Sequence, residues 1–187
     1  MGAPDDVQAD ERLIQEALSG ADDAFADLVR RHKRRVFAIA GRFARDRSEM
    51  EDLCQETFVR AYRGLGKYRG DAPFEHWLSR IAVHTCYDAL RKRRREEGDV
   101  PLDTVAFSLA ARPHEEELSP ERARSILSSA MAGLSPKERL VVTLLELEEK
   151  SVREVAALTG WSEANVKVRA HRARKALKRI LEACDER

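Results

Sequence analysis

The residues with the clearest chemical character lie near the C-terminus, where a turn signature precedes a run of cations. Ala156, Gly160 and Val166 have helix-turn-helix spacing: a small residue where two helices cross, a turn residue that tolerates unusual φ, and an apolar anchor. Ser162 can cap the second helix and leave its first turn free to approach phosphates or base edges. The pattern predicts that residues 151–181 bind DNA.

The second helix of this motif combines an apolar stripe with a cationic outer face. Its predicted buried stripe is Val166, Ala170, Ala173, Leu177 and Leu181. Side chains on the outer face can bind phosphates, and fewer of them read bases. A solvated terminal helix is the alternative, which the adjoining turn signature disfavours. The predicted DNA-contacting residues are Ser162, Glu163, Asn165, Lys167, Arg169, Arg172 and Lys175.

Upstream of this motif the apolar pattern predicts a helical bundle. Residues 24–43 repeat apolar side chains at three- and four-residue steps, and Ser48 with Glu51 forms a capping box that begins a second helix. A third amphipathic helix runs from Phe74 into the basic block at residues 91–95. With a shorter helix near residues 11–18, these segments make a plausible bundle.

Composition and the interruptions of the helical pattern predict an all-α fold of two small helical domains. Charged residues make up 36% of the 187-residue chain, aromatics only 6%, and Gly and Pro are scarce. From residue 96 to 119 the periodicity vanishes and acidic residues replace basic ones, which predicts a flexible linker. The predicted domains are therefore residues 1–95 and 120–187. Four short helices are expected in the second, starting at Ser119, Ser135, Ser151 and Ser162.

Charge and cysteine usage bear on the class of protein. The net charge is only +1, but basic residues are segregated from acidic segments such as Asp5 to Glu11, which we interpret as a tail. Cys54, Cys86 and Cys184 are odd in number and widely spaced, so neither a disulfide framework nor a CxxC zinc site is expected. Cys86 and Cys184 are interpreted as inert thiols and not as redox sensors, because no feature of the sequence predicts a low thiol pKa. Without a signal sequence or a long apolar run, the chain is expected to be cytoplasmic, with no membrane insertion and no cofactor.

Two long stretches resemble the extracytoplasmic-function (ECF) group of the sigma-70 family of bacterial RNA polymerase sigma factors. The family's second conserved region is similar to the stretch from Asp52, DLCQETFVRAYRGLGKYRGDAPFEHWLSRIAVHTCYDALRKRRR. Its fourth region is similar to the stretch from Leu134, LSPKERLVVTLLELEEKSVREVAALTGWSEANVKVRAHRARKAL. The pair in this order is far more specific than either stretch alone.

The resemblance implies a division of labour between the two domains. The first is expected to bind the β′ clamp helices of core RNA polymerase and to open the −10 element of promoter DNA. The second is expected to read the −35 element and to engage the β flap. An anti-sigma factor that holds the protein inactive is expected by resemblance only.

A polar face of the helix from Ser48 is the predicted polymerase-binding surface. It lies opposite the stripe of Leu53 and Ala61 and mixes charged, amide and apolar side chains. Without the resemblance, an ordinary solvated face is the better interpretation. The residues of the predicted surface are Asp52, Gln55, Glu56, Val59 and Arg63.

Strand opening needs a site that captures an unstacked base beside cationic backbone contacts. A loop and one face of the following helix have that composition. Trp77 lies within the apolar stripe and is interpreted as a core residue. His76 and His84 replace the Thr and Asn often found in the family, which leaves the base preference open. The predicted −10 contacts are Lys67, Tyr68, Arg69, Asp71, His76, Arg80, His84, Tyr87 and Arg91.

Two other classes of protein are alternatives to a non-enzymatic polymerase subunit. A stand-alone helix-turn-helix regulator usually needs dimer symmetry and a ligand or phosphorylation domain, and nothing in the sequence suggests either. Such a regulator should bind duplex promoter DNA tightly by itself, whereas a sigma factor should need core polymerase. An enzyme is disfavoured because the sequence has no glycine-rich phosphate loop, nucleophile elbow or HExxH motif.

Overall fold

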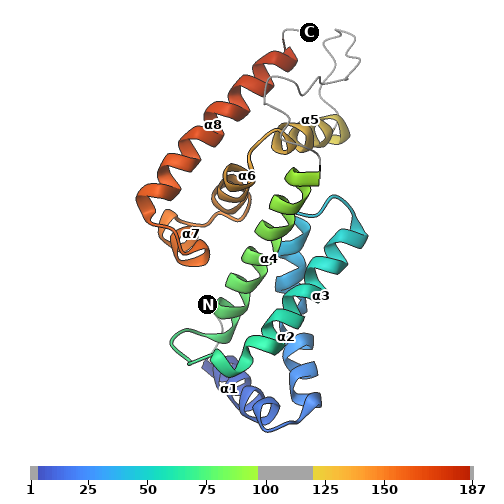
Figure 1. Cartoon of the computed structure of the whole chain (residues 1–187), viewed down its shortest axis with the longest axis vertical. Coiled ribbons are helices and arrows are strands. Elements are labelled where there is room, and N and C mark those ends of the chain that lie inside the picture. The colour runs from blue at the N-terminus through green and yellow to red at the C-terminus, as the bar shows by residue number, and fades with distance from the viewer. Residues whose placement is uncertain (1–3, 97–119, 186–187) are drawn as a thin grey trace. The chain divides into compact units, whose positions relative to one another are not determined.

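The fold was analysed in a computed structural model, which describes residues 4–96 and 120–185 (Figure 1). Those residues contain helices and no strands, which confirms the all-α prediction. The chain divides into two compact units, Met1–Ala89 and Leu90–Arg187. No helix in the described residues is long and apolar enough to cross a membrane. The predicted linker lies outside the described residues except for Glu96, the last residue of α4.

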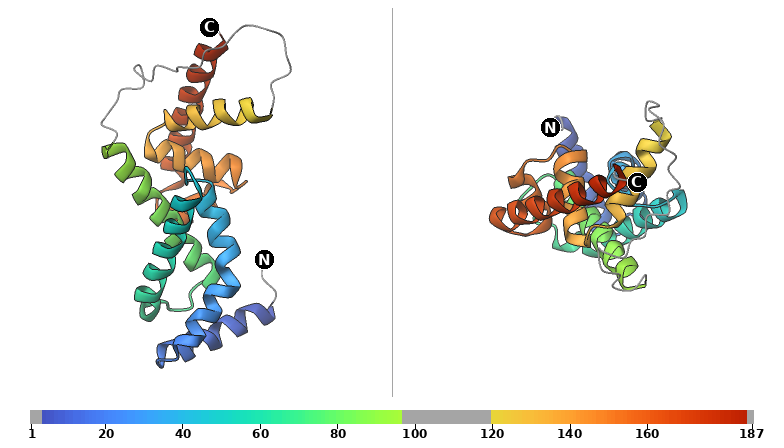
Figure 2. Two further views of the ribbon diagram at one scale, coloured as in Figure 1. Left: turned by 90° about the vertical axis from the view of Figure 1, so that its right-hand side faces the viewer. Right: turned by 90° about the horizontal axis from the view of Figure 1, so that it is seen from above.

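The first unit is built around three long helices that lie side by side (Figures 1 and 2). Its elements are α1 (Pro4–Leu18), α2 (Asp22–Gly41), α3 (Arg47–Gly64), the 3₁₀ turn η1 (Leu65–Lys67) and the part of α4 (Phe74–Glu96) that ends at Ala89. Apolar residues at helical spacing form its core, because each helix buries one face against the others. The largest fully buried side chains there are Leu28, Val36, Phe43, Leu78 and Val83.

The N-terminus of α3 differs from the sequence prediction. The predicted capping box of Ser48 and Glu51 is wrong, because both residues lie inside the helix. Asp46 is the N-cap, and its carboxylate accepts a hydrogen bond from the Glu49 backbone N–H at 2.8 Å. Asp caps a helix as well as Ser does, so of two neighbouring capping signals the earlier one sets the start.

Polar contacts fix α4 against both neighbouring helices. From α2, Arg35 donates to the Ser79 hydroxyl at 2.9 Å and pairs with Glu75 at 2.5 Å. From α3, Arg60 donates to the carboxylate of Asp88 at 2.8 Å. These contacts supplement the apolar packing and fix the rotation of α4, which carries most of the predicted −10 residues.

Helix α1 is an integral part of the first unit, contrary to the interpretation of the acidic N-terminal segment as a tail. Asp10 is only 6% exposed. One of its oxygens accepts from Arg31 Nε at 2.9 Å and the other lies 2.9 Å from His32 Nε2. A carboxylate can be buried only when other groups pair with it. The sequence interpretation was wrong because these partners lie on another helix, α2, and the local sequence does not show them.

We expect Asp10→Ala to lower the free energy of unfolding by about 2 kcal/mol, since the change removes a buried carboxylate that contacts both Arg31 and the half-buried His32. Arg31 is one-third exposed, which keeps the loss below that of a fully buried pair. Denaturant unfolding measures the effect. The control is Glu11→Ala, an exposed neighbour expected to change stability by less than about 0.5 kcal/mol. Equal effects of the two changes would contradict the anchoring role of Asp10.

Two cysteines of the first unit are inert by burial. Cys54 on α3 and Cys86 on α4 are both buried. Burial raises the pKa of the Cys54 thiol to about 11 and that of Cys86 to about 12. Neither thiol is ionised near neutral pH, and the thiolate is the reactive form.

We therefore expect Ellman's reagent to label neither Cys54 nor Cys86 in the native protein at pH 8. In the Cys184→Ser variant, which removes the third thiol, the native signal should be close to zero. Two equivalents should appear after unfolding in guanidinium. Rapid labelling of the native variant would show that one of the two thiols is accessible.

The second unit contains α5 (Pro120–Ala132), α6 (Pro136–Val142), the π turn η3 (Thr143–Leu147), α7 (Val152–Thr159) and α8 (Glu163–Asp185). Met131, Leu134, Val142 and Ala173 form a core cluster, with Leu177 packed against it. The predicted stripe is wrong at its last member, because Leu181 is 40% exposed. At 23 residues α8 is also not the short helix that was predicted.

The helix starts of this unit follow local signals. Ser135 and Ser151 form complete capping boxes with Glu138 and Glu154, as their spacing predicts. The Ser162 hydroxyl accepts from the Asn165 N–H at 3.2 Å, so it caps α8 as expected. The predicted start at Ser119 lies outside the described residues.

Candidate functional site

A hollow of about 380 Å³ lies between the loop after η1 and the first turns of α4. The loop turns at Gly70, whose φ of +75° suits glycine. The Tyr68 hydroxyl closes the loop by donating to the Ala72 carbonyl at 2.8 Å. Most predicted −10 residues are brought together here. The hollow is lined by Lys67, Tyr68, Arg69, Asp71, Ala72, His76, Trp77 and Arg80.

An aromatic cluster forms one wall of this loop hollow. The rings of Tyr68 and Trp77 lie 5.4 Å apart, and each lies within 6 Å of the ring of Phe74. The buried Phe74 also meets the ring of His32 edge-on at 5.3 Å. Because these contacts restrain each ring, the wall is preorganised for stacking.

Trp77 is half-buried, so its interpretation as a core residue is wrong. The fully buried stripe of α4 passes through Phe74, Leu78 and Ala82, and Trp77 lies at its edge. The indole covers Gly64, where an added Cβ would lie 3.5 Å from the ring. The ring therefore lies over the α3–α4 junction beside Gly64, with one part exposed.

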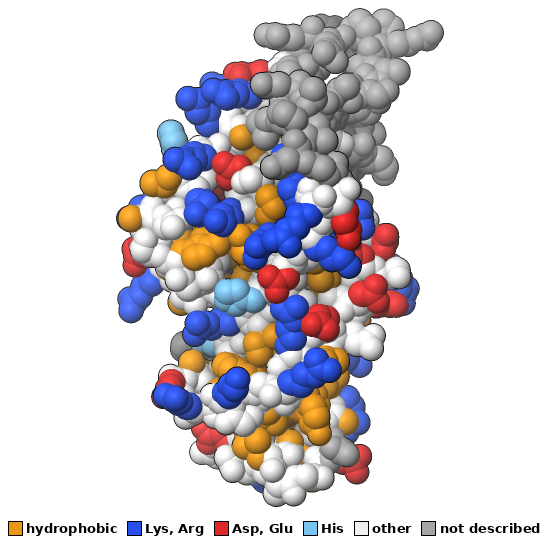
Figure 3. Space-filling view, viewed as in Figure 1, with side chains coloured by type: hydrophobic (Ala, Val, Ile, Leu, Met, Phe, Trp, Pro, Cys, Tyr) orange, Lys and Arg blue, Asp and Glu red, His pale blue; other side chains and the backbone are white. Residues whose placement is uncertain are grey.

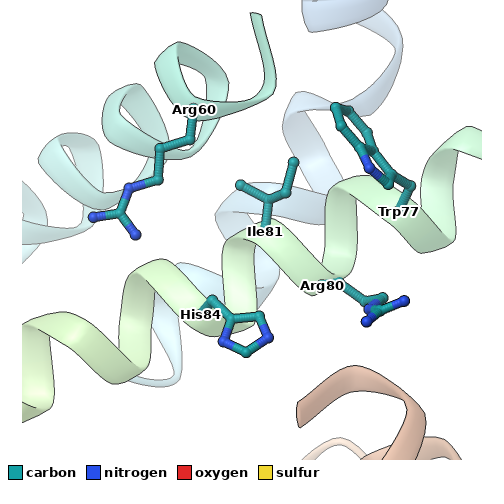
Figure 4. A pocket seen from close by; sticks show the side chains of 5 residues that line it. All are labelled: Arg60, Trp77, Arg80, Ile81 and His84. Atoms are coloured by element: carbon teal, nitrogen blue, oxygen red, sulfur yellow. The ribbon is translucent and has the colours of Figure 1, made fainter. Parts of the chain in front are cut away.

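A second hollow of about 390 Å³ lies between α3 and α4 (Figure 4). It adjoins the loop hollow, because Trp77 and Arg80 line both. Its other lining residues are Arg60, Ile81 and His84. The sequence prediction included His84 and Arg80 but not Arg60, Trp77 and Ile81. Only the packing of α3 beside α4 brings Arg60 to the hollow. Tyr87 and Arg91 line neither hollow.

The residues predicted to bind polymerase share one face of α3. Asp52, Gln55, Glu56 and Arg63 are exposed and Val59 is half-buried. Glu56 also pairs with Arg60 at 2.7 Å. Hydrogen bonds from Arg60 to Asp88 and then to Glu56 raise the pKa of its guanidinium. Glu56 therefore connects this surface to the second hollow, whereas Asp52 lies one turn away from that network.

The helix-turn-helix has the geometry that its sequence predicts. Gly160 ends α7 with φ +75° and ψ 14°, and its N–H donates to the Ala156 carbonyl at 2.9 Å. Val166 anchors α8 with no exposed surface. Thr159 is buried, with its hydroxyl donating to the Val155 carbonyl at 2.7 Å.

The first turns of α8 carry the predicted −35 residues on an open surface. Ser162, Glu163, Asn165, Lys167, Arg172 and Lys175 are exposed. Arg169 is half-buried: its guanidinium carbon lies 4.8 Å from the Trp161 ring centroid, and its Nε donates to Asn165 at 2.5 Å. Lys and Arg side chains gather over α8 (Figure 3). The role of Trp161 in holding Arg169 was not predicted from the sequence.

Comparison with known proteins covers both units. The family model described as Sigma-70 region 2 matches residues 28–96, and that described as Sigma-70, region 4 matches residues 124–177. The RNA polymerase sigma-H factor of Pseudomonas aeruginosa is 31% identical over 94% of this chain and 95% of its own. The ECF RNA polymerase sigma factor SigM of Mycobacterium tuberculosis is 31% identical over 93% of this chain and 85% of its own.

The chain belongs to the ECF group of sigma-70 factors. It is an RNA polymerase sigma factor that directs transcription initiation. Among solved structures, CnrH in complex with the cytosolic domain of CnrY matches with a TM-score of 0.61 and 31% identity, over 94% of this sigma factor and 98% of CnrH. The region 2 match contains α3 and both hollows, and the region 4 match contains the helix-turn-helix and the first part of α8.

Proposed function

We propose that this sigma factor opens promoters with residues 1–95 and anchors them with residues 120–187, the acidic segment 96–119 joining the two. The observation that carries this proposal is the loop hollow. Tyr68 and Trp77 supply π faces on which an unpaired base can stack, and Lys67, Arg69 and Arg80 supply cations for its phosphates. Asp71 and His76 add hydrogen-bonding groups that could discriminate base edges.

The exposed face of α3 is the proposed contact with the β′ clamp helices of core polymerase. An acidic side chain at Asp52 and an apolar one at Val59 offer the mixed chemistry of a non-obligate interface. The second domain is proposed to engage the β flap and to place the first turns of α8 in the −35 major groove. There the exposed cations can bind phosphates and the Asn165–Arg169 pair can reach bases.

A protein partner is also proposed. CnrH was solved in complex with the cytosolic domain of CnrY, and RpoE of Bartonella quintana, 26% identical, in complex with the anti-sigma factor NepR. On this likeness we propose that an anti-sigma factor binds this chain too. We also propose that it acts in the cytoplasm with RNA polymerase and has no catalytic activity of its own.

Promoter opening by the reconstituted holoenzyme tests the loop hollow. A 2-aminopurine base in the non-template strand of the −10 element reports unstacking. Tyr68→Ala and Arg80→Ala should each lower the opening rate about tenfold, the size expected for one lost base–aromatic or phosphate contact. Their affinity for core polymerase should stay unchanged.

The matched control is Arg34→Ala, which removes an exposed cation of α2 that lines neither hollow. It should open the promoter at the wild-type rate. If Tyr68→Ala and Arg80→Ala also open it at that rate, the loop hollow does not capture the −10 strand.

A further inference from the structure

Helix α1 lies beside the loop that forms the loop hollow. It packs against η1, from which that loop continues. Burial raises the pKa of the Tyr68 hydroxyl, and the charges of Glu11 and Asp10 on α1 raise it further. The match to region 2 begins only at residue 28, so α1 precedes the matched residues. A helix outside the region 2 match is therefore close enough to the loop to influence it.

The connection from α1 begins at a carboxylate that is held through both of its oxygens. One oxygen of Asp10 accepts from Arg31 Nε at 2.9 Å, and the other lies 2.9 Å from His32 Nε2. Because a carboxylate accepts hydrogen bonds, His32 Nε2 carries the hydrogen. The side chains of Asp10 and His32 are only 9% and 12% exposed, so water competes little for this bond. The bond fixes the imidazole, although the χ2 torsion of a histidine is otherwise broad.

The imidazole of His32 supports the aromatic wall without lining either hollow. Its ring meets the ring of the buried Phe74 edge-on, at a centroid distance of 5.3 Å. Phe74 in turn contacts Tyr68 at 5.8 Å and Trp77 at 5.5 Å, and these two rings line the loop hollow. Edge-on ring pairs depend on the orientation of each ring. An imidazole that was free to turn would therefore hold Phe74, and with it the wall, less firmly.

We propose that Asp10 and His32 are positioning residues of the loop hollow. Asp10 fixes the imidazole of His32, the imidazole holds Phe74, and Phe74 holds the rings of Tyr68 and Trp77 in the wall. Helix α1 thereby contributes to promoter opening without a DNA contact of its own. The effect on DNA rests on the proposed role of the loop hollow, whereas the effect on the rings does not.

Acrylamide quenching of Trp77 fluorescence tests the positioning in the free protein. The chain has two tryptophans, so Trp161→Phe leaves Trp77 as the only one. In that background, Asp10→Ala and His32→Ala should each raise the quenching constant, because a loosened wall exposes more of the indole. The control is Ile39→Ala, which removes buried apolar contacts of α2 about two turns beyond His32. It should lower stability and leave the quenching constant unchanged.

The His32→Gln variant separates the hydrogen bond from the ring. Its amide can still donate to Asp10, but it has no ring to meet Phe74. In denaturant unfolding, His32→Gln should regain part of the stability that His32→Ala loses. Its Trp77 should nevertheless be quenched as readily as in His32→Ala. A residue that only stabilised the fold would restore stability and Trp77 protection together.

Holoenzyme binding to fork-junction DNA tests the consequence for the promoter. The DNA carries an unpaired non-template −10 strand and stops short of the −35 element. His32→Ala should weaken binding about threefold, a part of the loss of about tenfold expected for one stacked base. In a Tyr68→Ala background, where the wall has already lost one ring, His32→Ala should weaken binding much less. Such non-additive losses are expected of residues that act through one site.

Two outcomes would overturn the positioning role. The first is a Trp77 quenching constant in Asp10→Ala and His32→Ala equal to that of the Ile39→Ala control. The second is a loss of DNA affinity from His32→Ala that adds in full to the loss from Tyr68→Ala. If quenching rises but neither His32→Ala nor Tyr68→Ala weakens DNA binding, the positioning of the rings stands and base capture by the loop hollow fails.

Discussion

The Asp52→Arg variant of this sigma factor is expected to lose at least about a hundredfold in affinity for core RNA polymerase. Asp52 is an exposed carboxylate on α3. If the interface buries Asp52 in a hydrogen-bonded charge pair, losing that partner costs about 2–5 kcal/mol, and reversing the charge adds repulsion. Fluorescence anisotropy of labelled sigma factor, titrated with core polymerase at several salt concentrations, measures the loss. Stability and binding by the helix-turn-helix should be unaffected.

A single reversal at Asp52 is a cleaner test than a double reversal with Glu56. Glu56 pairs with Arg60, so an added cation there would also disturb the second hollow and its Asp88 contact. Glu56→Gln serves as the milder probe of that position. The matched control is Asp23→Arg, which reverses an exposed carboxylate of α2. Core affinity equal to this control would remove Asp52 from the docking surface.

The parts of the molecule that sequence analysis predicted well depend on signals a few residues apart. The capping boxes that begin at Ser135 and Ser151 lie within four residues. The turn at Gly160 needs only a left-handed backbone between two helices, and Val166 follows it at a fixed spacing. Local geometry decides these features, so the sequence carries them without knowledge of tertiary structure.

The features that were missed depend on contacts between distant segments. Asp10 looks like part of an acidic tail until α2 supplies Arg31 and His32, more than 20 residues later. Trp77 fits the apolar period of α4, but in the structure its ring lies beside Gly64 at the edge of the buried face. The second hollow forms only because α3 places Arg60 beside α4. Periodicity identifies a buried face but does not reveal what lies at its edge.

Replacing Lys167 and Arg172 together by alanine is expected to lower promoter-dependent transcription by about ten- to a hundredfold, with core binding unchanged. Both side chains are exposed on the first half of α8, where we propose that cations neutralise DNA phosphates. Each lost phosphate contact should reduce the slope of log affinity against log salt by about one. Promoter binding by holoenzyme between about 50 and 200 mM salt measures this slope.

The control for this pair is Arg179→Ala, which removes an exposed cation of α8 beyond the predicted DNA-contacting residues. It should leave both the slope and transcription near wild-type values. Loss of polymerase binding by the Lys167 and Arg172 variants would instead show that the proposed division between the two domains is wrong.

Arg169 should behave differently from Lys167 and Arg172, because its guanidinium is already held by Trp161 and Asn165. A preorganised guanidinium loses little entropy on binding and can discriminate a guanine edge, whereas a free cation follows any phosphate. Arg169→Ala should therefore change the ranking of −35 sequences in a promoter library, while Lys167→Ala weakens all of them about equally. If both variants weaken every −35 sequence by the same factor, Arg169 contacts the DNA backbone. The remaining polar residues of the first turn of α8 would then be the ones that read bases.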